Sequence, residues 1–430
     1  MRIRWVNHAS FVVEGEDFKL LVDPWLLGNA FNNGWSLLAP TEMDDSYWAG
    51  ITHIWFSHEH PDHFSPPSLA SIKDKLNPKA VIFYQETKDK RVVGYCKAKG
   101  YDVIEAKDRQ KYKIGRYAEI MVGQVPFYDS WLHIQSDGVS LLNLNDCVIK
   151  NSERLESIKK SCGPVDILFC QFGYANWEGN PEEDARQKKS AFEKLLRLKL
   201  AADVFAPKYL FPFASYVVFS HSENFYLNAN NNTVAKAVEF IQEKCTGQPV
   251  VLKPNDVWSP GDSVPLAENI RFYEEKRRAW TQGKSTDKTF SADQLLEIID
   301  KSNQRVLTRN SPVLVNLCSK LHFFNALDFY VDDLDIVLRF DYLKGGMVLN
   351  EAYAPDRHIK LSSDSLAFLF SNEYGFDTLS VNGRFRATNQ VEKQMFRTLS
   401  LGALNNMGVP LSFTLPFRWK IVSRVIAKLA

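Results

Sequence analysis

Three histidines and one aspartate fall within six residues of the segment SHEHPDHF, residues 57–64. The segment follows the run ITHIWF, whose apolar, aromatic and β-branched side chains predict a buried strand. In an extended segment, residues two apart point the same way, so His58 and His60 converge, whereas Asp62 and His63 lie past a turn and face a second point nearby. Imidazole and carboxylate groups bind Zn, Fe or Mn, and two convergent pairs suit two adjacent ions. The segment therefore predicts a dinuclear metal site, with a solvated polar loop as the plain alternative.

The flanking sequence predicts the elements that must hold this segment in place. Pro61 and the pair at 66–67 punctuate the chain, and residues 68–76 have the apolar spacing of a helix. The segment then lies on a strand-to-helix loop. Further strands are predicted over residues 3–13, 18–22, 80–84, 102–105, 131–135, 139–144 and 165–170, with helical stretches between and after 80–84 and 102–105 and a long helix near 181–201.

Length and composition bound the class of protein. A chain of 430 residues is too long for one ordinary core, so we expect two domains. Its 45% apolar and 24% charged residues are typical of a soluble globular protein, and a net charge of +1 gives no support for nucleic-acid binding. The six cysteines are scattered without a C-x-x-C pair, which predicts buried, reduced thiols in a cytoplasmic protein. Neither a signal peptide nor an apolar run of membrane-spanning length is expected.

The pattern H-x-H-x-D-H after a strand resembles the signature of the metallo-β-lactamase superfamily. The resemblance implies an α/β fold, an αβ/βα sandwich with its metals at one edge. A narrower resemblance, over residues 7–230, is to the metal-binding part of CMP-N-acetylneuraminate hydroxylases, and it continues weakly around 365–396. The segments that carry it are VDPWLLGNAF at 22–31, GW at 34–35, NDC at 145–147, PFA at 212–214 and SHS at 220–222.

The superfamily resemblance implies roles for residues outside the motif. Asp23, at a strand end, is expected behind the metals, where it would orient ligands by hydrogen bonds; the alternative is a turn or helix cap. Asp146 is expected to bridge the metals, and His221 to bind the second one. Asp62, Asp146 and His221 are therefore the expected catalytic residues. His8 could line the pocket, although a lone histidine is more often structural.

One position departs from the superfamily pattern. A further histidine is expected just before the strand at 131–135, but the sequence there offers Asp129, which can bind a hard metal. Strand alternation puts His133 on the same face, as the weaker candidate. A site richer in carboxylates favours iron and oxygen chemistry over a zinc hydrolase. After the strand at 165–170, Tyr174, Asn176 and Trp177 suit a substrate wall, or ordinary loop packing.

The two domains are predicted at 1–264 and 265–430. The second is expected to be α+β, with helices near 292–302 and 390–404 and strands near 335–341 and 378–381, and to cover the active-site edge or mediate association. Its tail, 416–429, carries four cations and no acid. Trp419, Val422, Val425, Ile426 and Leu429 share one helical face, which could contact an anionic membrane or dock on its own domain.

Three classes of function follow from these features. The first is a non-haem iron oxygenase acting on an acylated sugar or nucleotide-linked metabolite. The hydroxylases it resembles carry a Rieske domain, whose C-x-H pairs are absent from this sequence, so its electrons would come from a separate Rieske or ferredoxin-type protein. The second is a zinc or manganese hydrolase that cleaves a phosphodiester, lactone or amide. The third, a non-catalytic binding domain, is disfavoured because the motif is intact.

Overall fold

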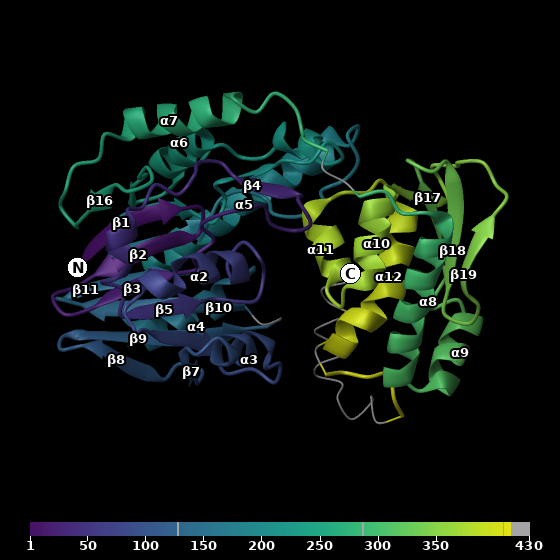
Figure 1. Ribbon diagram of the computed structural model, residues 1–430. Coiled ribbons are helices and arrows are strands. Elements are labelled where there is room, and N and C mark those ends of the chain that lie inside the picture. The colour runs from purple at the N-terminus through teal and green to yellow at the C-terminus, as the bar shows by residue number, and fades with distance from the viewer. Residues whose placement is uncertain (127–128, 286–287, 407, 414–430) are drawn as a thin grey trace.

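The computed structural model describes residues 1–126, 129–285, 288–406 and 408–413. Within them, two seven-stranded sheets lie face to face in the first part of the chain, and a four-stranded sheet with helices forms the second part (Figure 1). The predicted tail helix at 416–429 lies outside the described residues. No described helix is long and apolar enough to cross a membrane.

The first sheet joins antiparallel strands at one side to parallel strands at the other. Its order is β16 (Val257–Trp258), β1 (Arg2–Asn7), β2 (Ser10–Glu14), β3 (Lys19–Val22), β5 (His53–Phe56), β6 (Val81–Gln85) and β7 (Asp102–Ala106). β3, β5, β6 and β7 run parallel, with α2 (Pro66–Ile72) and α3 (Arg91–Ala98) in the connections between them. Two short helices also lie in this part of the chain: α1 (Asp45–Trp48) precedes β5, and η1 (Lys73–Lys75) follows α2.

The second sheet repeats this plan. Its order is β15 (Gln248–Pro249), β13 (Tyr209–Phe213), β12 (Ile167–Gln171), β11 (Val139–Asn143), β10 (Asp129–Ser136), β9 (Ala118–Val125) and β8 (Lys111–Gly115). The helices of this half are α4 (Ser152–Cys162), α5 (Asp184–Phe205), α6 (Val234–Lys244), α7 (Leu266–Arg278) and the short η2 (Phe225–Asn228). β4 (Trp35–Leu37) and β14 (Val217–Phe219) pair as a separate ribbon.

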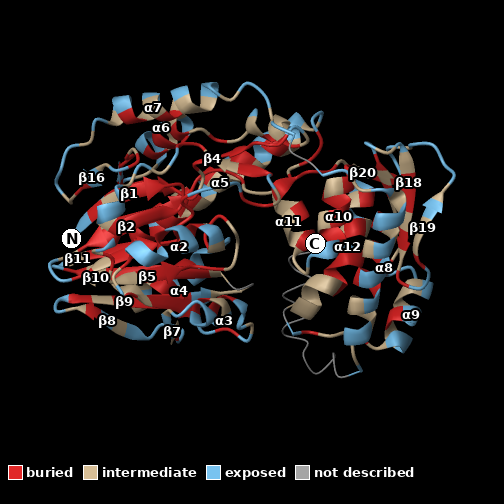
Figure 2. Cartoon of the chain, in the orientation of Figure 1, coloured by how far each residue is buried: buried red, intermediate tan, exposed pale blue. Residues whose placement is uncertain are grey.

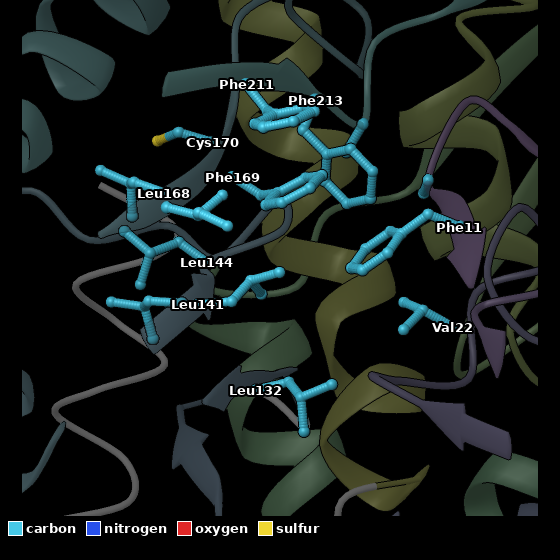
Figure 3. Packing of buried hydrophobic residues seen from close by; sticks show 14 of the residues in the cluster. Phe11, Val22, Leu132, Leu141, Leu144, Leu168, Phe169, Cys170, Phe211 and Phe213 are labelled. Carbon is cyan, nitrogen blue, oxygen red and sulfur yellow. The ribbon is translucent and has the colours of Figure 1, made fainter. Parts of the chain in front are cut away.

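Aromatic side chains fill the space between the two sheets. Phe11 of the first sheet stacks on Phe169 of the second, with ring centroids 4.6 Å apart, and Phe169 stacks on Phe211 at 4.3 Å (Figure 3). The central strands of both sheets are buried along most of their length (Figure 2). This packing supports the predicted αβ/βα sandwich and fixes the edge at which the strands end.

Three local predictions were wrong. The run at 3–13 is not one strand, because the chain reverses at His8-Ala9 between β1 and β2. The stretch after 102–105 forms the strands β8 and β9, which extend the second sheet, and not a helix. Residues 378–381 belong to the helix α11 (Gly375–Asn382), whose Phe376 and Leu379 are buried on one side.

The second part of the chain packs helices against a sheet of order β19 (Gly345–Leu349), β18 (Ile336–Asp341), β17 (Leu327–Val331) and β20 (His358–Leu361). The helices are α8 (Ala292–Arg309), α9 (Pro312–Lys320), α10 (Ser363–Ser371), α11 and α12 (Asn389–Asn406). Its hydrophobic cluster also takes in Trp25, Phe31 and Trp35 from the first part. Tyr273 of α7, beyond the predicted boundary at 264, packs instead in the core of the first part.

Candidate metal centre

Strand direction brings the candidate ligands to one edge of the sandwich. β1, β3 and β5 of the first sheet share a direction, so His8, Asp23 and the 57–64 segment follow their carboxyl ends. In the second sheet, Asp146 follows the carboxyl end of β11. Asp129 begins β10, which runs antiparallel to β11 and therefore starts at the same edge.

Asp23 is the hub that orients the histidines. Its carboxylate accepts hydrogen bonds from the Ser57 backbone N–H (2.7 Å), the Ser57 hydroxyl (2.7 Å) and Asn145 Nδ2 (2.8 Å). His63 Nδ1 lies 2.9 Å from Asp23 Oδ2. Because an ionised carboxylate only accepts, Nδ1 carries a proton, so Nε2 of His63 is the nitrogen that can bind a metal once it has given up its own proton. Asp23 and Asn145 both adopt positive φ angles (39° and 54°), backbone strain of the kind that clusters at functional sites.

The same reasoning fixes His58. The Ser57 hydroxyl uses its proton on Asp23, so its oxygen accepts from His58 Nδ1 at 2.9 Å. Nε2 of His58 is then the nitrogen with a lone pair. It faces Asp146 Oδ2 at 3.7 Å, the same distance that separates Asp146 Oδ2 from His63 Nε2.

The buried atoms without a hydrogen-bond partner among the described residues include Asp62 Oδ1, His63 Nε2 and Asp146 Oδ1 of this centre. Orphaned buried polar atoms call for an explanation, and these three are metal-ligand types. Asp62 Oδ2 lies 3.2 Å from His63 Nε2. Spacings of 3.2 and 3.7 Å are those of neighbouring ligands around an ion with bonds of about 2.1 Å. The residues present therefore fit bound metal ions.

The electrostatics also call for cations. Burial raises the pKa of Asp129 well above its ordinary value, and the neighbouring Asp146 raises it further. Burial opposes protonation of His63, but nearby carboxylates, led by Asp62, raise its pKa well above the ordinary value. Burial lowers the pKa of His60 to about 3, which keeps that imidazole neutral and able to bind a metal.

His8 contacts this centre through a hydrogen bond to Asp62. Its Nδ1 accepts a hydrogen bond from the Tyr216 backbone N–H at 3.1 Å, so in the neutral ring Nε2 carries the proton. Nε2 lies 3.3 Å from Asp62 Oδ2 and donates to it. Although His8, Asp62 and His63 have ligand atoms within 4.8 Å of one another, a protonated Nε2 has no lone pair to offer. His8 therefore holds the Asp62 carboxylate in place beside His63 by this hydrogen bond.

Comparison with known proteins agrees with this geometry. Residues 2–182 match the model of a family described as a beta-lactamase superfamily domain. This part of the chain is similar to that family.

Similar proteins extend beyond that domain. The cytidine monophosphate-N-acetylneuraminic acid hydroxylase of Danio rerio is 26% identical over 274 residues, which cover 56% of this chain and 43% of the relative. The chain thus spans less than half of that protein. Solved structures include CmlA, a diiron beta-hydroxylase from Streptomyces venezuelae (16% identity, TM-score 0.44, covering 60% of this chain and 53% of that one). Another is an isothiocyanate hydrolase from Delia radicum gut bacteria (13%, TM-score 0.42, 60% and 98%).

Asp129 and His133, the two candidates for the further ligand, lie in different surroundings. Asp129 Oδ1 lies 3.5 Å from His58 Nδ1, within the centre, and burial together with the nearby Asp129 carboxylate raises the pKa of the Cys147 thiol. His133 instead bonds Ser140 through Nε2 at 2.9 Å, within the β10–β11 hairpin. Asp129 therefore lies beside the superfamily motif, whereas the His133 side chain is hydrogen-bonded within its own hairpin.

His60 and His221 lie in contrasting surroundings. The His60 ring is 4.5 Å from that of His58, centroid to centroid, within the 57–64 segment. His221 is fully buried after β14, with Nδ1 3.2 Å from Glu223 Oε2, and its backbone bridges to Lys284. His60, Asp129 and His221 belong to neither of the two donor clusters found in the described residues, so their roles as ligands stay predictions.

The predicted substrate wall is mostly core. Tyr174 is buried and its hydroxyl donates to the Leu227 carbonyl, while Trp177 packs on Phe385 of the second part with ring centroids 4.5 Å apart. Asn176 bonds the side chain of Glu178. The contacts of Tyr174 and Trp177 are those of packing residues. Contact of any of the three with a substrate stays a prediction.

Proposed function

We propose that the chain is a dinuclear metalloenzyme, and favour a non-haem iron hydroxylase of a small molecule. The observation that carries the proposal is Asp146 Oδ2, which lies 3.7 Å from the Nε2 atoms of both His58 and His63. A carboxylate placed between two imidazoles in this way suits a bridge between two ions. Similarity to the N-acetylneuraminic acid hydroxylases supports the hydroxylase class.

Each ion would draw on its own set of residues. His58, His60 and Asp129 would hold the first, and two histidines with one carboxylate are the ligand set of many non-haem Fe(II) oxygenases. Asp62 and His63 would hold the second, where the sequence adds His221. Asp23 and His8 would hold these ligands in their tautomers and orientations by hydrogen bonds.

When bound, reduced iron supplies the capacity to activate O₂. Insertion of one oxygen atom into a C–H bond, with the other leaving as water, takes up two electrons and two protons. We propose a Rieske or ferredoxin-type protein as the source of these electrons. Burial of the centre keeps bulk water from the ligands and their hydrogen bonds.

The test compares iron-loaded and zinc-loaded protein. The iron form should consume O₂ only when a reductant is present, and substrate should couple that consumption to a hydroxylated product. The alternative, a hydrolase, would cleave a phosphodiester, lactone or amide anaerobically with zinc or manganese and ignore reductant. Anaerobic turnover without reductant would refute the hydroxylase and leave the hydrolase.

A further inference from the structure

A cavity of about 390 Å³ opens beside the motif, between the two parts of the chain. This volume is near the lower end of the range for small-molecule sites, roughly 300–1,000 Å³. His60 lines it from the motif, and Tyr374 and Thr378 line it from the second part. A molecule held there would lie next to a proposed ligand of the first ion.

The walls of the cavity are mainly apolar and aromatic. Phe31, Phe64, Val92 and Tyr95 come from the first part, and the ring of Tyr374 faces them from the second. Such walls fit a flat or acyl group by shape and by removal of apolar surface from water.

The charges of the cavity are unbalanced toward acids. Among the described residues, Glu59, Asp89 and Asp377 line it together with one cation, Arg91. Glu59 lies between His58 and His60 in the motif, and burial raises its pKa to about 7. In the ionised form, its carboxylate can accept a hydrogen bond from an incoming donor.

Arg91 is already committed. Its Nε and Nη2 donate to Asp89 (2.9 and 2.6 Å), its Nη1 donates to Glu373 at 3.1 Å, and its guanidinium lies 4.0 Å from the centre of the Tyr374 ring. The Tyr374 hydroxyl also donates to Asp89 at 2.8 Å. These contacts close the rim of the cavity across the two parts. They pair Arg91, the one arginine or lysine among the described lining residues, with two carboxylates that offset its charge.

We propose that this cavity is the substrate site and that it takes a small molecule with an aromatic or acyl body, hydrogen-bond donors and no negative charge. The inference rests on the proposed function, because it assigns the substrate class of that same centre. Of the two substrate classes suggested by the sequence, it selects the uncharged acylated group over the nucleotide-linked one. Recognition of a phosphate would need a free guanidinium or ammonium group at this position.

Three isosteric probes test the charge preference by calorimetry on the full chain as purified, with its metal content measured. They are benzamide (neutral), benzamidine (cationic) and benzoate (anionic). Benzamide and benzamidine should bind at least tenfold more tightly than benzoate. Thr378→Trp, which fills the cavity, should remove this binding. Benzoate bound directly to metal would survive that substitution and is thereby distinguished from binding in the cavity.

A matched pair of variants tests whether Glu59 is responsible for the charge preference of the cavity. Glu59→Gln should reduce the ratio of benzamidine to benzoate affinity at least fivefold with unchanged metal content, whereas Glu156→Gln, on the exposed face of α4, should leave it unchanged. Benzoate binding in the cavity as tightly as benzamide, or no probe binding at all, would overturn the inference. If the probes bind in the expected order but the iron-loaded protein does not consume O₂ in the presence of reductant, only the proposed function is refuted.

Discussion

Two substitutions at His8 should separate stability from metal affinity. The ring makes one bond on each side: Nδ1 accepts from the Tyr216 backbone, and Nε2 donates to Asp62. Asparagine can place an acceptor near the position of Nδ1 but cannot reach Asp62. Glutamine can place a donor near the position of Nε2 but does not restore the acceptor for Tyr216.

The magnitudes follow from these two bonds. Leaving the buried Tyr216 N–H without a partner costs about 1–3 kcal/mol of unfolding free energy, so His8→Gln should destabilise the metal-free protein by that amount. Removing a group that orients a metal ligand typically weakens metal binding by about 10–100-fold, so His8→Asn should do so at the Asp62 site. His8→Ala should show both effects.

The assays are urea unfolding of the metal-free protein and competition with a chromophoric chelator. Stoichiometry distinguishes the two roles of His8. If His8 only orients Asp62, His8→Asn still binds two ions, the second more weakly. Complete loss of one ion with wild-type affinity for the other would show that His8 is a ligand and that the tautomer argument is wrong.

Three further substitutions test other parts of the molecule. His58→Ala combined with His60→Ala should abolish metal binding by elemental analysis, and full occupancy would contradict the assignment of the motif. Asp129→Ala should lower the occupancy of the first ion and remove activity. His133→Ala, the control on the same strand, should leave the metal content unchanged. The opposite pattern would make His133, and not Asp129, the ligand. Arg384→Leu should destabilise the chain by about 3 kcal/mol in urea unfolding, because it leaves two partly buried carboxylates without their buried guanidinium partner. A loss below about 1 kcal/mol would show that these ion pairs add little.

The residues predicted best are those that the chain itself places together. His58, His60, Asp62 and His63 lie in one short loop after a strand, so strand position alone is enough to make them neighbours. Asp23 and Asp146 follow other strands, and their location came from family resemblance. The structure supplies what the sequence lacks, namely the distance of 3.7 Å from Asp146 to each of two imidazoles.

His8 was underestimated because its turn is hidden in the sequence. The run from Ile3 to Val13 is apolar at most positions and contains neither glycine nor proline. The polar pair Asn7-His8 was the available signal for a reversal within this run. A two-residue connection there places His8 at the edge where the parallel strands end. In a continuous strand, the same residue would lie within the sheet.

Tertiary packing also explains why the predicted strand at 378–381 is part of the helix α11. Thr378 to Val381 contains two β-branched residues and favours a strand locally. In the structure, Phe376 and Leu379, three residues apart, are both buried in the cluster of the second part. This helical spacing was present in the sequence, but its apolar stripe is short. Only the neighbouring helices make it decisive.

The second part of the chain completes a site whose chemistry resides in the first. The beta-lactamase superfamily match ends at residue 182, yet Tyr374 and Thr378 line the cavity next to His60. Arg384, fully buried, pairs with Glu223, whose carboxylate also contacts His221. The Arg384 guanidinium thus joins the segment after β14 to the second part of the chain. If the cavity is the substrate site, as proposed, the choice of substrate depends in part on residues beyond the superfamily match.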